Sequence, residues 1–181
     1  MATAQSRVTD MTRGDPVQLL LNFSAPLFLS NLLQQFYNLA DTALAGHILG
    51  DAALAQIGAT AALYGLIMNF AFGMNNGLAL TVSRLFGAGD DKGVRRATAW
   101  MLALAAATAA VLTVVFVGVR RPLLVLLQVP ESTMEGALAY LTLILLGIPL
   151  TMAYNMEAAL LRAIGNSLTP LYFLLFSTVL N

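Results

Sequence analysis

Residues 26–46 read Pro26-Leu-Phe-Leu-Ser-Asn-Leu-Leu-Gln-Gln-Phe-Tyr-Asn-Leu-Ala-Asp41-Thr-Ala-Leu-Ala-Gly46. This stretch is apolar enough for a membrane helix, yet it carries a carboxylate and several amides. A charged side chain at the centre of a bilayer costs at least ~2.5–3.5 kcal/mol on insertion scales, so it is rare there without a functional role. The stretch therefore predicts a membrane helix, residues 17–45, with a titratable group, Asp41, on a polar side.

The whole chain has the composition of an integral membrane protein. Of its 181 residues, 59% are hydrophobic and 10% are charged, against about 25% charged in an average soluble domain. The formal net charge is zero, so no basic surface indicates binding to nucleic acid. The absence of cysteine excludes disulfides and thiolate metal sites.

The apolar runs predict an all-α fold, a polytopic transmembrane helix bundle, because a spanning helix needs about 20 apolar residues. Four full spans and a truncated fifth are expected. Arg120-Arg121-Pro122 is expected to stop the third helix, since proline cannot continue the hydrogen-bond ladder. The expected membrane helices are residues 17–45, 52–83, 97–119, 136–161 and 170–181.

The fifth apolar run is too short to cross a bilayer. Residues 170–181 cover roughly 18 Å as a helix, whereas the hydrocarbon core is about 30 Å thick. A terminal carboxylate at that depth would be costly. The chain is therefore expected to be a piece of a longer protein.

The distribution of lysine and arginine predicts a cytoplasmic N-terminus, because these residues concentrate on the inner side of a membrane. With residues 1–15 as a cytoplasmic segment, seven basic residues lie inside and two, Arg120 and Arg121, lie outside. The inner set comprises Arg7, Arg13, Arg84, Lys92, Arg95, Arg96 and Arg162.

Polar side chains of the first helix gather on one side of a helical wheel. The stripe consists of Ser24, Asn31, Gln35, Asn38 and Thr42, with Gln34 and Asp41 beside it. Such a stripe cannot face lipid cheaply. It forms either a polar seam between helices or the wall of a cavity that contains a titrating Asp41. The carboxylate favours the cavity, because amides alone would make an adequate seam.

Asp41 and Pro26 are the candidate functional residues of this helix. Burial in a low dielectric disfavours the charged form of a carboxylate. Asp41 would then exchange a proton near neutral pH, or hold a sodium ion with amide oxygens, which hard cations prefer. Pro26 removes one backbone donor and forms either a static kink or a hinge that bends when Asp41 changes charge.

The other helices supply fewer candidates. In the second helix, Gly58 and Gly65 predict close helix packing, with substrate contact by Asn69 or Asn76 as the alternative. In the fourth helix, Tyr140 is either an interfacial aromatic residue or a cavity wall, and Asn155 lies deeper and is expected to face the cavity. No catalytic triad or metal-ligand cluster is present in the sequence, so neither enzyme activity nor a cofactor is expected.

Four parts of the chain resemble the multidrug and toxic compound extrusion (MATE) family. They are residues 26–46, residues 82–89 (Val-Ser-Arg-Leu-Phe-Gly-Ala-Gly), residues 161–170 (Leu-Arg-Ala-Ile-Gly-Asn-Ser-Leu-Thr-Pro), and Asn181, which stands where prokaryotic members have a cavity asparagine. The resemblance implies an antiporter of two six-helix lobes in the inner (plasma) membrane. It would export amphipathic, often cationic, drugs and toxic compounds by alternating access, in exchange for protons or sodium.

By this resemblance, residues 1–181 form a partial N-terminal lobe whose partners are membrane lipid, small amphipathic or cationic substrates, and the second lobe. The resemblance implies a cation-coupling site of Asp41, Asn38 and Asn181. It implies a substrate cavity lined by Gln34, Tyr37, Tyr140 and Asn155. Two alternatives stay open: a lipid-linked saccharide flippase of the same superfamily, and a membrane fragment that does not transport.

Overall fold

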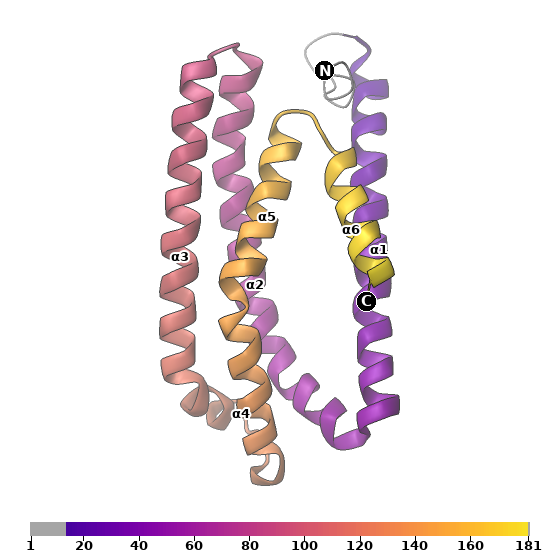
Figure 1. Ribbon diagram of the computed structural model, residues 1–181, viewed down its shortest axis with the longest axis vertical. Coiled ribbons are helices and arrows are strands. Elements are labelled where there is room, and N and C mark those ends of the chain that lie inside the picture. The colour runs from indigo at the N-terminus through magenta and orange to yellow at the C-terminus, as the bar shows by residue number, and fades with distance from the viewer. Residues whose placement is uncertain (1–13, 181) are drawn as a thin grey trace.

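The computed structural model describes residues 14–180, and within this range the chain folds only into α-helices and short connections. The helices are α1 (Pro16–Leu49), α2 (Asp51–Gly87), α3 (Asp91–Leu126), α4 (Glu131–Leu146), α5 (Ile148–Ala163) and α6 (Leu168–Leu180). Helices α2 to α5 pack together, whereas α1 and α6 lie side by side next to this group (Figure 1).

Three to four of these elements are candidate membrane spans. Helices α1, α2 and α3 are each long and apolar enough to cross a bilayer, and α4 with α5 forms a fourth candidate span that is bent by 43°. The predicted all-α membrane fold is confirmed. Helix α6 is apolar but shorter, with 13 residues.

Helix α3 extends beyond the predicted residues 97–119 at both ends. At its start, the Asp90 carboxylate accepts a hydrogen bond of 2.9 Å from the backbone N–H of Gly93, which caps the helix. At its end, the prediction that Pro122 stops the helix is wrong. Proline removes only one donor, and Leu124 beyond it is fully buried, so packing carries the helix to Leu126. The chain then turns at Gln128, which has a φ of 57°.

The predicted single helix over residues 136–161 is two helices that meet at Gly147. Its backbone N–H donates to the carbonyls of Leu143 and Ile144, at 3.2 and 3.1 Å, which closes α4. Pro149 lies in the first turn of α5. Backbone N–H groups in a first turn make no hydrogen bond within the helix, so proline is tolerated there. Helices α1, α2 and α6 begin one or two residues before the predicted spans, and α1 and α2 end four residues later.

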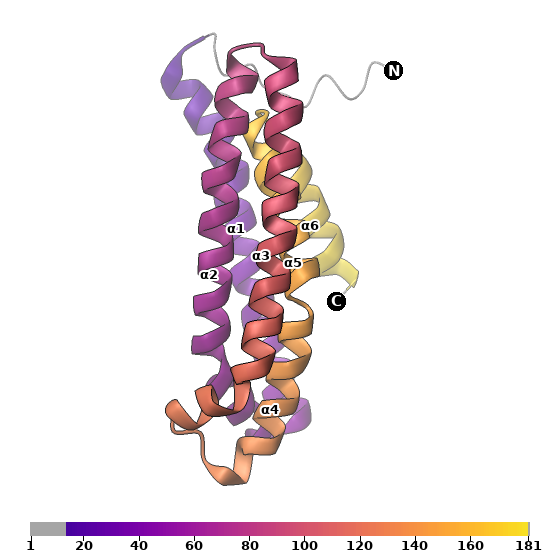
Figure 2. The ribbon, with the colours of Figure 1, turned by 90° about the vertical axis from the view of Figure 1, so that its left-hand side faces the viewer.

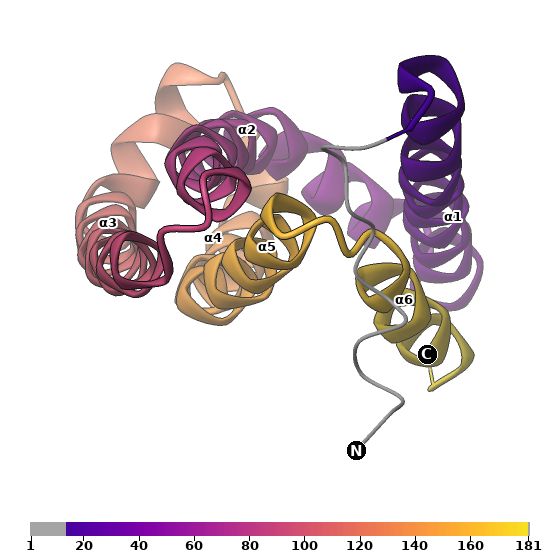
Figure 3. The ribbon, with the colours of Figure 1, turned by 90° about the horizontal axis from the view of Figure 1, so that it is seen from above.

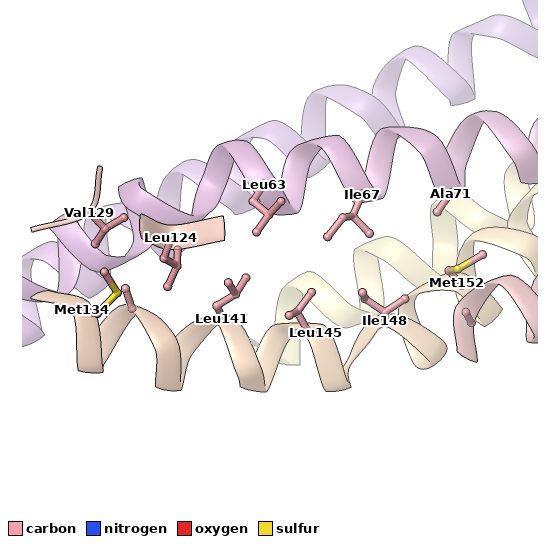
Figure 4. Close-up of a cluster of buried hydrophobic side chains, with 12 residues drawn as sticks. Leu63, Ile67, Ala71, Leu124, Val129, Met134, Leu141, Leu145, Ile148 and Met152 are labelled. Atoms are coloured by element: carbon pink, nitrogen blue, oxygen red, sulfur yellow. The ribbon is translucent and has the colours of Figure 1, made fainter. Parts of the chain in front are cut away.

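Two buried clusters hold α2 against α3, α4 and α5. In the larger one, Leu63 and Ile67 of α2 face Leu141 and Leu145 of α4 and Ile148 of α5 (Figure 4). The smaller one joins α2, α3 and α5 through Ala79, Val82, Met101, Ala105, Met156 and Ala159. No described residue of α1 is buried. The core therefore belongs to α2–α5, and the main contact of α1 with this group runs along α2.

Packing of α2 does not use the glycines that the sequence favoured. A Cβ atom added at Gly58 or Gly65 would meet no atom of the described chain within 4 Å. The close approach instead lies at the other side of the helix, where Gln56 meets Gly136 of α4. The prediction of glycine packing on α2 is thus wrong for contacts within residues 14–180.

Gly136→Ala is expected to raise the free energy of unfolding by less than Gly65→Ala, because the gain of about 1 kcal/mol in helix propensity is offset at Gly136 by the forced shift of the Gln56 side chain. The added Cβ would lie 2.1 Å from Nε2 of Gln56, so that amide must move. Thermal unfolding in detergent measures the effect, with Gly65→Ala as the matched control. In a Gln56→Ala background the two alanine substitutions should have equal effects. Equal melting temperatures of Gly136→Ala and Gly65→Ala with Gln56 present would contradict the contact.

Candidate functional site

A cavity of about 590 Å³ lies between α1, α2, α5 and α6. In the view along the helices, α1 and α6 lie to the right of the group formed by α2, α3, α4 and α5 (Figure 3). One end of α2 extends toward α1. The polar lining residues are Ser30, Asn31, Gln34, Tyr37 and Asn38 of α1, Tyr64 and Asn69 of α2, Thr151, Tyr154, Asn155 and Arg162 of α5, and Ser177 of α6. The cavity is therefore a chamber rich in amides and hydroxyls, with one guanidinium group, that of Arg162, among its described lining residues.

Most of the predicted cavity residues line this chamber. Gln34, Tyr37 and Asn38 reach it from α1 and Asn155 from α5, where the Asn155 amide donates to the Thr151 carbonyl at 3.0 Å. Gln35, a member of the predicted stripe, is exposed and is not a lining residue. The cavity face of α1 is thus rotated from the predicted stripe toward Gln34.

Asp41 lies beside the chamber rather than in its wall. It is half-buried, one helical turn after Tyr37, and the Tyr37 hydroxyl donates a hydrogen bond to its carboxylate. Tyr140 of α4 lies within electrostatic reach of both Asp41 and Tyr64, although it is not among the residues that line the chamber. Tyr37 of α1 and Tyr140 of α4 therefore both interact with this carboxylate, and Tyr64 of α2 interacts with Tyr140.

The structure adds lining residues that sequence reasoning missed, of which Arg162 is the most informative. The sequence placed Arg162 in an inner loop, whereas it lies in the last turn of α5. It is half-buried and is the charged residue among the described lining residues of the chamber. It also lines an adjoining cavity of about 380 Å³ together with Asn76. Its helical spacing from Asn155, seven residues or two turns, was the available signal.

Pro26 and Asn181 complete the predicted set. Pro26 lies inside α1, where Oγ of Ser30 donates to its carbonyl at 2.8 Å. Because proline has no N–H, the carbonyl of Asn22 lacks its usual helical donor. Asn181 lies outside the described residues, so its place beside Asp41 remains a prediction.

Comparison with known proteins places the chain in a family. Residues 26–181 match the family model MatE. The chain is 32% identical over 179 residues to "Probable multidrug resistance protein YpnP" of Bacillus subtilis, which covers 95% of this chain and 39% of that protein. It is 31% identical over 171 residues to "Probable multidrug resistance protein NorM" of Pseudomonas putida, covering 91% and 35%. The chain thus spans less than half the length of these curated relatives.

The fold has close counterparts among solved structures. The crystal structures described as MATE in the bent and in the straight conformation superpose with TM-scores of 0.84 and 0.83, at 23% identity, over 92% of this chain and 37% of those chains. The same fold is seen in a complex of MATE with MaD3S, with a TM-score of 0.84. Taken with the match over residues 26–181, the chain belongs to the MATE family of multi-pass membrane transporters and is not an enzyme.

Proposed function

We propose that this chain is part of the N-terminal lobe of an antiporter that exports amphipathic, often cationic, drugs and toxic compounds. Export proceeds by alternating access and is coupled to the entry of protons or sodium ions. The membrane is the inner (plasma) membrane, and the N-terminus lies in the cytoplasm. The single observation that carries the proposal is the hydrogen bond from Tyr37 to Asp41 at the edge of a polar chamber of about 590 Å³. It connects the titratable Asp41 to Tyr37, a residue that lines the chamber in which the substrate would bind.

The size and lining of the chamber favour small amphipathic compounds. Ligand sites of about 300–1,000 Å³ suit small molecules when apolar walls carry a few polar groups. Here Tyr37, Tyr64 and Phe72 offer aromatic surface, and Gln34 and Asn155 offer amides. Asp41 gives a cationic substrate an attractive charge nearby. The second lobe of the full-length protein would close the opposite side.

Coupling follows from the position of Asp41 in the least enclosed helix. A charge-assisted hydrogen bond to an ionised carboxylate is stronger than a neutral one, so binding of a proton or a sodium ion at Asp41 weakens its hold on Tyr37. Asn38 faces the chamber one helical turn before Thr42 and, with Asn181, would supply amide oxygens to a sodium ion. Since no described residue of α1 is buried, α1 shifts against α2 and α6 without opening the core.

Transport by the full-length protein in everted membrane vesicles tests the proposal. Ethidium is the substrate, and either a proton gradient or a sodium gradient is imposed. Accumulation that depends on one gradient, compared with vesicles lacking the protein, is the expected result. Translocation of lipid-linked saccharide without ethidium transport would indicate a flippase, and no translocation of either kind would indicate a non-transporting protein. Both outcomes overturn the proposal.

Pro26→Ala is expected to lower transport turnover about tenfold, equivalent to roughly 1.4 kcal/mol on the barrier, with little change in substrate affinity. Alanine restores the missing backbone donor and stiffens α1 at the point where proline interrupts its hydrogen-bond ladder. Turnover in vesicles and binding to purified protein measure the two effects separately. Pro16→Ala is the matched control, because Pro16 lies in the first turn of the same helix. Unchanged turnover in Pro26→Ala would rule out the hinge.

A further inference from the structure

A second cavity lies where the end of α3 meets the start of α4. This is the opposite end of the bundle from the turn between α2 and α3 (Figure 2). We call it the α3–α4 groove. It has a volume of about 570 Å³ and is lined by Gly118, Arg120, Arg121, Glu135, Leu138, Ala139 and Thr142. An adjoining cavity of about 400 Å³ shares Arg121 and Glu135 and adds Glu131. None of these residues lines the transport chamber.

The mouth of the groove carries charges of both signs that do not neutralise one another directly. Arg121, Glu131 and Glu135 are exposed and Arg120 is half-buried. A guanidinium N–H of Arg120 donates to the carbonyl of Val117 on its own helix. In the described part of the chain, no ion pair within 4 Å joins these arginines to these glutamates. Two guanidinium groups and two carboxylates are thus available to one ligand.

The floor of the groove is formed by small residues and continues into an exposed apolar surface. Gly118 has open space where a Cβ would stand, and Ala139 faces it from α4. Val114 on α3 and Leu143 on α4 each lie about one helical turn further from the mouth of the groove, and both are 71% exposed. A molecule with a charged head at the mouth would therefore lay an apolar tail along these side chains.

The charges select the head of that molecule. A purely anionic head would meet Glu131 and Glu135, and a purely cationic one would meet the arginines. A phosphate binds guanidinium groups through paired, charge-assisted hydrogen bonds. A primary ammonium carries three donors for carboxylates, which a trimethylated ammonium lacks. We propose that the α3–α4 groove binds a phospholipid with a phosphoethanolamine head, its phosphate on Arg120 and Arg121 and its ammonium on Glu135.

Lipid retention by the full-length protein, measured by native mass spectrometry, tests this site independently of transport. Phosphatidylethanolamine, phosphatidylcholine and phosphatidylglycerol with the same acyl chains are offered in turn. Wild type is expected to retain phosphatidylethanolamine about tenfold better than phosphatidylcholine, the size of one hydrogen bond to a charged group. Glu135→Gln should abolish that preference, and Arg121→Gln should weaken retention of all three lipids.

Matched controls are available elsewhere in the chain. Glu157→Gln changes an exposed carboxylate on α5, and Arg95→Gln changes an exposed cation on α3; both should keep the wild-type preference. Glu135→Asp keeps the charge and should keep most of the preference, which separates a lost contact from a misfolded variant. Equal retention of phosphatidylethanolamine and phosphatidylcholine by wild type, or an unchanged preference in Glu135→Gln, would overturn the proposal. So would a groove covered by the rest of the protein, since no variant would then change retention.

Discussion

Asp41→Asn is expected to reduce gradient-driven export to the level of vesicles that lack the protein. Asparagine has nearly the same shape and still accepts a hydrogen bond from Tyr37, but it neither takes up a proton nor carries the charge that attracts a sodium ion. The driving ion then has no group through which to act. Ethidium transport under imposed proton and sodium gradients measures the loss, and thermal unfolding of the purified protein should show that the fold survives.

A second carboxylate provides the control for this substitution. Asp51, at the start of α2, is exposed, and Asp51→Asn is expected to transport at the wild-type rate. Full transport by Asp41→Asn would remove Asp41 from the coupling mechanism. Equal loss in both variants would show that the effect is not specific to the chamber.

Asn75→Asp is expected to lower the free energy of unfolding by about 3–5 kcal/mol, the cost of an uncompensated buried charge. Asn75 of α2 is 0% exposed. Its amide N–H donates to the Met152 carbonyl of α5 at 3.4 Å, while its own oxygen has no hydrogen-bond partner among residues 14–180. A carboxylate there loses the donor and faces a carbonyl oxygen. Thermal and denaturant unfolding of the protein in detergent measure the change.

Two further variants determine whether burial causes that loss. Asn75→Leu removes both polar atoms at similar volume and is expected to be nearly neutral or stabilising, since the amide oxygen is already unsatisfied. Asn76→Asp places the same charge on the next residue, which lines the cavity adjoining the chamber, and should cost little. Equal stability of Asn75→Asp and Asn76→Asp would show that Asn75 is not enclosed.

The helices that hold the candidate site could be predicted from hydropathy, but the side of α1 that lines the chamber could not. The wheel placed Gln35 in the polar stripe and Gln34 beside it, whereas Gln34 lines the chamber and Gln35 does not. A helical wheel gives the angle between side chains but not the positions of the neighbouring helices. Those positions depend on α2, α5 and α6, and on long-range contacts that periodicity does not report.

The predicted helix ends failed where tertiary packing competes with local sequence signals. Pro122 was expected to end α3, but burial of Leu124 beyond it outweighs the loss of one hydrogen bond. Conversely, Gly147 and Pro149 were expected to lie inside one span, yet they separate α4 from α5 by a bend of 43°. Local residue preferences give the same signal in both places, so only the packing of the flanking turns distinguishes them.

Since no described residue of α1 is buried, the proposed function has a consequence for how chemically different compounds would be accommodated. Regions with few enclosed contacts open locally at a small fraction of the global unfolding free energy. Here the region with the fewest such contacts is also one wall of the ligand chamber, whereas α2 and α5 across from it belong to the rigid scaffold. Under the proposed function, we expect compounds of different shapes to be accommodated by deformation of this single helix, while the remainder of the lobe keeps one conformation.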